Sequence, residues 1–166
     1  MIALELFENL KSICAGFDAH YDVMDCEGLR YVSVQRYPML IVANTSRAPN
    51  PGHWCSFFMK DESSPIEFFD TFNLPPDVHN EDFLPFMRRM SDQMLTMPRA
   101  IQCQDSNYCG HHCLNYLSAR LNQKTIEYIY TYVFSPGCRS NDLQSKNFVK
   151  SITASRRVKK CKRRQK

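Results

Sequence analysis

A cysteine at the predicted start of a helix is the first candidate for chemistry in this sequence. Apolar residues with helical spacing predict a helix from about Cys109 to Leu121, capped by Ser106 or Asn107. Unpaired backbone N–H groups and the positive end of the helix dipole stabilise a thiolate at such a position and lower its pKa. Cys109 is therefore a candidate nucleophile or, alternatively, one more buried thiol. Cys113, one turn later, is expected to pack in the core.

A histidine and an aspartate at the ends of two predicted strands could assist that nucleophile. The aromatic segments 53–60 and 66–72 flank a turn near Asp61–Ser63, which predicts a β-hairpin. Residues whose numbers sum to about 124 then face each other, so His53 and Asp70 become cross-strand neighbours. We predict His53 as a general base and Asp70 as its orienting partner, although each type is also common at strand ends.

Acyl transfer also needs fixed donors for an oxyanion. Gln102 and Gln104 lie shortly before Cys109, and a side-chain amide from either could join the Cys109 backbone N–H in that role. Both glutamines could equally be ordinary loop residues.

The hydrophobic pattern predicts the elements that would position these groups. Segments with helical spacing and short β-branched and aromatic runs both occur, so the chain is expected to contain helices as well as strands. The segment 126–134 fits either a helix or a strand. We expect helices over 4–13, 81–94 and 141–152, and strands over 31–35, 39–45 and, interrupted by a proline, 95–102.

The composition is that of one globular domain. The chain has 166 residues, 43% of them hydrophobic, which is enough for a core. No apolar run is long enough to span a bilayer and the first residues lack a signal-peptide pattern, so we expect an intracellular monomer without a membrane role. Thiols stay reduced in that setting, so the eight cysteines are expected to be mostly buried hydrophobic residues rather than disulfide partners.

Positive charge is concentrated at the end of the chain. The net charge is +4, yet the last eleven residues hold eight of the 21 Lys and Arg residues, so the rest is net negative. We therefore predict a single domain over 1–155 and a basic, mobile tail over 156–166. Such a tail could bind nucleic acid through its phosphates, act as a nuclear import signal or have no role. The candidate phosphate-binding residues are Arg156, Arg157, Lys159, Lys160, Lys162, Arg163 and Arg164.

Three motifs together resemble the adenovirus-protease (adenain) type of cysteine peptidase, which belongs to a wider group that includes the ubiquitin-like-protein proteases. They are GHW (52–54), EFFDTFNLPP (67–76) and Gln102 followed by CGHHC (109–113). The order His, Asp, Gln, Cys is that of the family. The stretches NTSRAPNPGHW, FDTFNLPP and CGHHCLNYL are most similar to proteases of Polinton (Maverick) elements and adintovirus-like viruses.

The resemblance implies a papain-related α+β fold, in which a mixed central sheet packs against helices. It also implies Cys109 as nucleophile, His53 as general base and Asp70 as its orienting partner. The seven-residue Gln-to-Cys spacing of Polinton-type proteases selects Gln102 over Gln104 as oxyanion donor. The implied activity is a thiol endopeptidase that matures viral or transposon-encoded precursor proteins, in the host nucleus or the virion. Its chemistry would require no metal or other cofactor. Adenovirus proteases are helped by DNA and by a short viral peptide, so activation by either is an expectation here.

Other interpretations stay open. Cys109, His112 and Cys113 have helical spacing that could ligate a metal, although zinc ligands usually come as two separated pairs and no second pair stands out. The C-x-x-x-C spacing does not fit a thioredoxin-like redox pair. The fold could instead serve a protease that removes ubiquitin-like modifiers, or a nucleic-acid-binding protein built on a protease-like fold.

Overall fold

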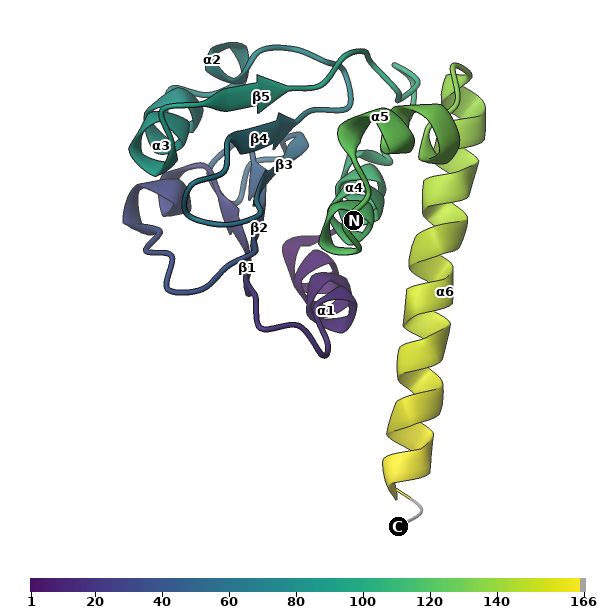
Figure 1. The fold of residues 1–166 in the computed structure, drawn as a ribbon. Coiled ribbons are helices and arrows are strands. Elements are labelled where there is room, and N and C mark those ends of the chain that lie inside the picture. The colour runs from purple at the N-terminus through teal and green to yellow at the C-terminus, as the bar shows by residue number, and fades with distance from the viewer. Residues whose placement is uncertain (165–166) are drawn as a thin grey trace.

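The computed structural model describes residues 1–164, and of 157–164 it describes the backbone alone. Five strands form one sheet in the order β1-β2-β3-β4-β5 (Figure 1). The inner pairs β2/β3 and β3/β4 are antiparallel and the outer pairs are parallel, so the sheet is mixed and the predicted α+β class is confirmed. The strands are β1 (His20–Asp25), β2 (Met39–Asn44), β3 (Trp54–Met59), β4 (Ile66–Phe69) and β5 (Met94–Thr96).

Helices cover both faces of the sheet (Figure 1). One face packs against α1 (Ala3–Ile13) and α4 (Cys109–Leu121), and α6 (Cys138–Arg164) packs on the outer side of these two helices (Figure 1). The other face packs against η1 (Glu27–Tyr31) and α3 (Phe83–Met90). The remaining helical segments are short: α2 (Pro76–His79), α5 (Ile126–Tyr128) and the π-helix η2 (Ile129–Val133).

The central strands alternate their side chains between these two layers. Trp54 and Phe58 of β3 belong to the cluster beneath α1 and α4, whereas Phe57 packs with Phe68 and Phe83 on the opposite face. Every residue of β3 and β4 is buried, because helices exclude water from both faces. The hairpin that precedes the predicted site is therefore held rigidly from both sides.

A buried ion pair fixes α4 against the sheet. Arg120 near the end of α4 makes two hydrogen bonds to the carboxylate of Glu67 on β4, at 2.7 and 2.5 Å. The hydroxyl of Tyr116 donates to the same carboxylate at 2.5 Å. Because both donors lie on α4, this cluster sets the helix orientation and with it the position of Cys109 at the helix start.

The predicted elements agree with the structure where apolar periodicity is strong. The helices predicted over 4–13 and 109–121 are confirmed. The strand predicted over 31–35 is wrong, because Tyr31 is the last residue of η1 and residues 32–35 have irregular backbone. The strand that pairs with the outer edge of β2 is β1 instead. The sequence does not predict β1, because its side chains are half-buried and include two aspartates, which interrupt a strand pattern. The ambiguous segment 126–134 is helical.

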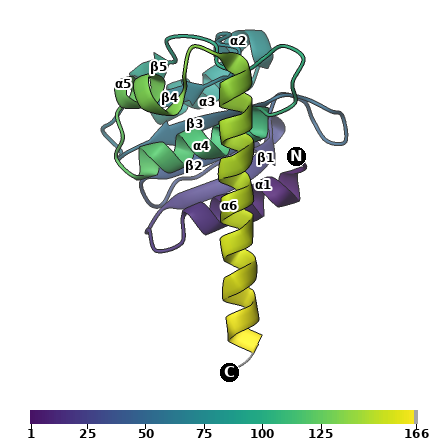
Figure 2. The same ribbon diagram turned by 90° about the vertical axis from the view of Figure 1, so that its right-hand side faces the viewer.

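Helix α6 begins earlier and ends later than predicted. It crosses α4 and α1 and then extends beyond the rest of the molecule (Figures 1 and 2). The boundary predicted at 155/156 falls inside this helix, since Lys and Arg are good helix formers and no Gly or Pro interrupts the run. The predicted mobility of 156–166 stays a prediction, and the side chains after Arg156 lie outside the described residues. Within residues 1–164, no helix is long and apolar enough to cross a membrane.

Candidate active site

The β3–β4 hairpin brings His53 and Asp70 together. His53 lies immediately before β3 and Asp70 immediately after β4. The imidazole Nε2 of His53 lies 2.5 Å from Asp70 Oδ1. Ser56 pairs with Phe69, and continuing this register places Cys55, not His53, directly opposite Asp70. The hairpin register is thus shifted from the predicted one. His53, two residues before Cys55, reaches the carboxylate of Asp70 diagonally.

The carboxylate of Asp70 is buried, with only 1% of its surface exposed, and has several partners. Its Oδ2 accepts a hydrogen bond from the Leu74 backbone N–H at 2.7 Å and lies 3.2 Å from His79 Nε2. Burial alone would raise the pKa of Asp70, but the contacts with His53, His79 and Leu74 together lower it. Asp70 is therefore ionised and can stabilise a positive charge on His53.

Cys109 is the first residue of α4 and is half-buried beside His53. Burial raises the pKa of its thiol, but the interaction with His53 and the backbone hydrogen bonds from Trp54 and Gly110 outweigh that effect and lower it. For His53 the directions are reversed: burial lowers the pKa of the imidazole, but the contacts with Asp70 and Cys109 raise it to about 9. These opposite shifts favour a thiolate–imidazolium pair, the form that attacks carbonyl groups.

Close packing sets the position of Cys109. A β-carbon on Gly110 would lie 3.1 Å from the Leu6 side chain and 3.5 Å from the Trp54 ring. A larger residue would therefore require the Leu6 side chain or the start of α4 to shift. The glycine that follows the cysteine keeps the thiol close to the hairpin that carries His53.

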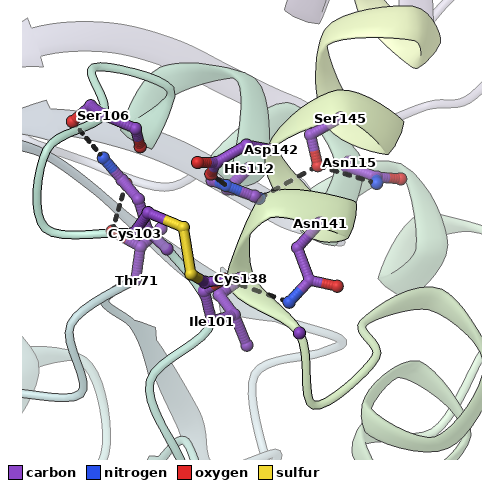
Figure 3. Close-up of polar contacts among 12 residues, drawn as sticks. Thr71, Ile101, Cys103, Ser106, His112, Asn115, Cys138, Asn141, Asp142 and Ser145 are labelled. Atoms are coloured by element: carbon purple, nitrogen blue, oxygen red, sulfur yellow. Dashed lines mark hydrogen bonds and ion pairs between the residues drawn. A yellow bond between two sulfur atoms is a disulfide. The ribbon is translucent and has the colours of Figure 1, made fainter.

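Gln102 lies in the loop before α4, and its side chain is buried and doubly hydrogen-bonded. Its Oε1 accepts from Thr71 Oγ1 at 2.7 Å, and its Nε2 donates to the Ser106 carbonyl at 2.8 Å (Figure 3). Gln104, the alternative donor, is exposed. Gln102 is thus held in one orientation, which an oxyanion donor requires. Its role as that donor stays a prediction.

One disulfide departs from the expectation that the cysteines are mostly reduced and buried. Cys103 is bonded to Cys138, the first residue of α6, with Cα atoms 5.0 Å apart (Figure 3). The adjacent Ile101 carbonyl accepts a hydrogen bond from Asn141 of α6 at 3.0 Å. Because the two cysteines are 35 residues apart, only the packing of α6 on this loop reveals their pairing. Gln102 therefore lies between two residues, Ile101 and Cys103, that are each bonded to α6.

Most of the other cysteines behave as predicted. Those that the structure shows to be buried and free are Cys14, Cys26, Cys55 and Cys113. Burial raises the pKa of each of these four thiols, which keeps them protonated and weakly nucleophilic.

The motif CGHHC does not converge on one metal position. His112 is buried, with Nε2 2.8 Å from Asp142 Oδ1 and Nδ1 2.9 Å from Ser145 Oγ (Figure 3). Cys113 donates instead to the Trp54 carbonyl, at 3.3 Å. The two side chains are therefore committed to different partners, and His112 joins α4 to α6.

Two residues near Asp70 were not predicted to belong to the site. His79, on α2, stacks on the His53 ring with centroids 5.5 Å apart and reaches the far oxygen of Asp70. Cys55 directs its thiol at Asp70 Oδ1 from 3.9 Å. The consecutive prolines Pro75 and Pro76 indicate a helix start, and a helix there could bring His79 back toward the sheet. The length of the turn before this helix does not indicate which helix residue would face Asp70.

The predicted phosphate-binding residues lie on α6, away from this site (Figure 1). Arg156 contacts Glu8 of α1 at 3.5 Å, so a carboxylate already faces its charge. The side chains of the other six residues lie outside the described part of the chain.

Known proteins show similarity in structure alone. No protein-family model and no curated protein matches this sequence. Two structures of the ASFV pS273R protease superpose with TM-scores of 0.60 and 0.63, at 17% and 15% identity, covering 87% and 89% of this chain. The chain spans only 65% of each of those proteins. The SUMO protease Ulp1 superposes with a TM-score of 0.50 and 10% identity over 92% of this chain and 78% of its own. The chain therefore has the fold shared by these cysteine proteases.

Proposed function

We propose that this protein is a cysteine endopeptidase that cleaves precursor proteins of a virus or a Polinton-like mobile element. The observation that carries the proposal is the placement of Cys109 at the start of α4 beside a His53–Asp70 pair, with the pKa of the thiol lowered and that of the imidazole raised. The likeness to a viral protease fold supports it. The motifs shared with Polinton and adintovirus-like proteases support the class of substrate.

The geometry suggests the order of the chemical steps. Asp70 engages Nε2 of His53, which leaves Nδ1 to exchange a proton with Cys109. The Cys109 thiolate attacks the substrate carbonyl, and the oxyanion is held by the Cys109 backbone N–H and, in this proposal, by Gln102. The imidazolium protonates the leaving amine, which breaks the peptide bond. Water, deprotonated by His53, then hydrolyses the thioester and regenerates the thiol.

The experiment is an unbiased search for cleavage. The purified chain is incubated with a pool of unmodified proteins, with and without DNA, and new N-termini are identified by mass spectrometry. Recurrent cuts that disappear with Cys109→Ala would support an endopeptidase and reveal its sequence preference. No cuts under either condition would contradict the proposal.

A second candidate is a protease for ubiquitin-like modifiers, favoured by the superposition on the SUMO protease Ulp1. Such an enzyme would release a folded modifier that ends in Gly-Gly, whereas a precursor peptidase cuts extended peptides. Incubation with modifier fusions tests this alternative directly. Release of the modifier without cuts in the unmodified pool would favour it.

A further inference from the structure

A second histidine reaches the oxygen of Asp70 that His53 does not contact. His53 Nε2 lies 2.5 Å from Oδ1, whereas His79 Nε2 lies 3.2 Å from Oδ2. The Leu74 backbone N–H donates to the same Oδ2 at 2.7 Å. The far oxygen of the carboxylate therefore has two neighbours of its own, one from the turn after β4 and one from α2.

Aromatic rings surround His79 and hold its imidazole against the carboxylate. Its side chain is 8% exposed, and the ring stacks on the His53 ring with centroids 5.5 Å apart and an interplanar angle of 25°. The rings of Phe68 and Phe83 lie against it at centroid distances of 6.0 and 6.4 Å. Nε2 is buried and makes no hydrogen bond to any described residue, so the approach to Asp70 is the polar contact that the structure gives this atom.

The contact between His79 and Asp70 is favourable only if Nε2 carries a proton. Burial raises the pKa of Asp70, but its contacts with His53, His79 and Leu74 outweigh that effect, and the carboxylate is ionised. A nitrogen lone pair that faced this carboxylate would be repelled, whereas an N–H dipole is attracted. Nε2–H of His79 therefore faces Oδ2, although it lacks the alignment of a hydrogen bond.

The residue after His79 ties α2 to the backbone of His53. Asn80 Nδ2 donates to the Thr45 carbonyl at 3.1 Å. The Thr45 N–H donates to the His53 carbonyl at 2.8 Å, and the His53 N–H donates to Thr45 Oγ1 at 2.9 Å. The end of α2 and the residue before β3 thus share one anchor, which keeps both histidines in place around Asp70.

We propose that His79 is a positioning residue of the peptidase, which holds the Asp70 carboxylate in the orientation that His53 requires. A carboxylate held at one oxygen alone can rotate about its Cβ–Cγ bond. The N–H groups of Leu74 and His79 together fix Oδ2 and so direct Oδ1 at His53. An imidazole held in this way presents Nδ1 to Cys109. This role rests on the proposed function, since only a peptidase would need the alignment for catalysis.

Replacement of His79 separates positioning from packing. His79→Phe keeps an aromatic ring between Phe68 and Phe83 but removes the N–H, so we expect kcat/KM to fall by about tenfold, through kcat rather than KM. His79→Gln places an amide N–H near the position of Nε2 and should restore most of the lost activity. A side chain that only packs would give the reverse order, with Phe tolerated and Gln harmful.

The pH profile of Cys109 alkylation gives a readout that needs no peptide cleavage. A misaligned Asp70 stabilises the His53 imidazolium less, so the alkylation midpoint should move up toward ~8.5 in His79→Phe and stay unchanged in His79→Gln. In the Asp70→Asn protein, adding His79→Phe should not move the midpoint further, because His79 acts through that carboxylate. His20→Phe, at a partly buried histidine of β1, is the matched control and should change neither activity nor midpoint.

A further variant keeps the test decisive. His79→Asn, whose shorter amide cannot reach Oδ2, replaces His79→Phe if circular dichroism shows that the latter does not fold. The role of His79 would be overturned by an unchanged midpoint and kcat, by equal losses in the Phe and Gln variants, or by a shift that persists in the Asp70→Asn protein. If no peptidase activity exists, the alkylation midpoint still decides whether His79 orients the pair, so the two proposals fail separately.

Discussion

His53 contacts Asp70 although Cys55, not His53, is the residue opposite Asp70 in the hairpin register. The geometry of this pair therefore depends on a diagonal contact between strand ends. The far oxygen of Asp70 is held by the Leu74 N–H, which prevents the carboxylate from rotating away. The orientation of the imidazole thus depends on the turn after β4 as well as on the strands.

Asp70→Asn should test this contact. The amide keeps the shape of the side chain but cannot stabilise an imidazolium, so we expect peptidase activity to fall by about 10²- to 10⁴-fold. Circular dichroism should show an unchanged fold. The exposed Asp18→Asn serves as the matched control and should retain full activity. Activity within twofold of the unaltered protein would remove Asp70 from the mechanism.

The pH dependence of Cys109 alkylation should reveal the thiolate–imidazolium pair. Because the pKa of Cys109 is lowered, its reaction with iodoacetamide should be half-maximal below the ~8.5 of a free thiol. His53→Ala should move that midpoint up toward ~8.5. Mass spectrometry of the Cys109 peptide gives the rate, and an identical profile in both proteins would rule out the pair.

Peptidase activity should also have an alkaline limit. In the proposed mechanism protonated His53 donates to the leaving amine. Its pKa is raised to about 9, so the acid is present below that pH and lost above it. We expect kcat/KM to fall as the pH rises through about 9. The profile should be measured in buffers of constant ionic strength, and a decline centred near the ordinary 6.5 of histidine would contradict the raised pKa.

Ser145→Ala should destabilise the contact between α4 and α6. Ser145 Oγ bonds to His112 Nδ1 and accepts from Asn115 Nδ2 at 3.1 Å, and all three side chains are buried. Removing the hydroxyl leaves a buried acceptor and a buried donor unpaired, so the free energy of unfolding should fall by about 1–3 kcal/mol. Urea denaturation measures it. Ser151→Ala, an exposed site on the same helix, should change it by less than about 0.5 kcal/mol.

Arg120→Met should be more costly, because it leaves the Glu67 carboxylate buried without its cation. Removing one partner of such a pair typically costs about 3–5 kcal/mol. Adding Glu67→Gln removes the unpaired charge and should restore part of the loss. The comparison of single and double variants by urea unfolding decides the point: a double variant no more stable than Arg120→Met would show that the ion pair is not the cause.

The sequence alone was sufficient for the local features of this protein. Apolar periodicity marked α1 and α4 within a residue or two, because each helix has one face committed to the core. The aromatic runs around a short turn indicated the β3–β4 hairpin and hence the nearness of His53 and Asp70, despite the shift in register. The residue order His, Asp, Gln, Cys, together with its flanking motifs, suggested the α+β protease fold.

The tertiary structure decided which distant side chains meet. Three sets of contacts join segments whose separation in sequence carries no periodic signal. They are the bond between Cys103 and Cys138, the buried partners of His112 on α6, and the approach of His79 to Asp70. Local patterns reflect interactions between near neighbours, such as helical spacing and strand alternation. Contacts between elements depend instead on how whole helices pack on the sheet, which no short stretch of this chain specifies.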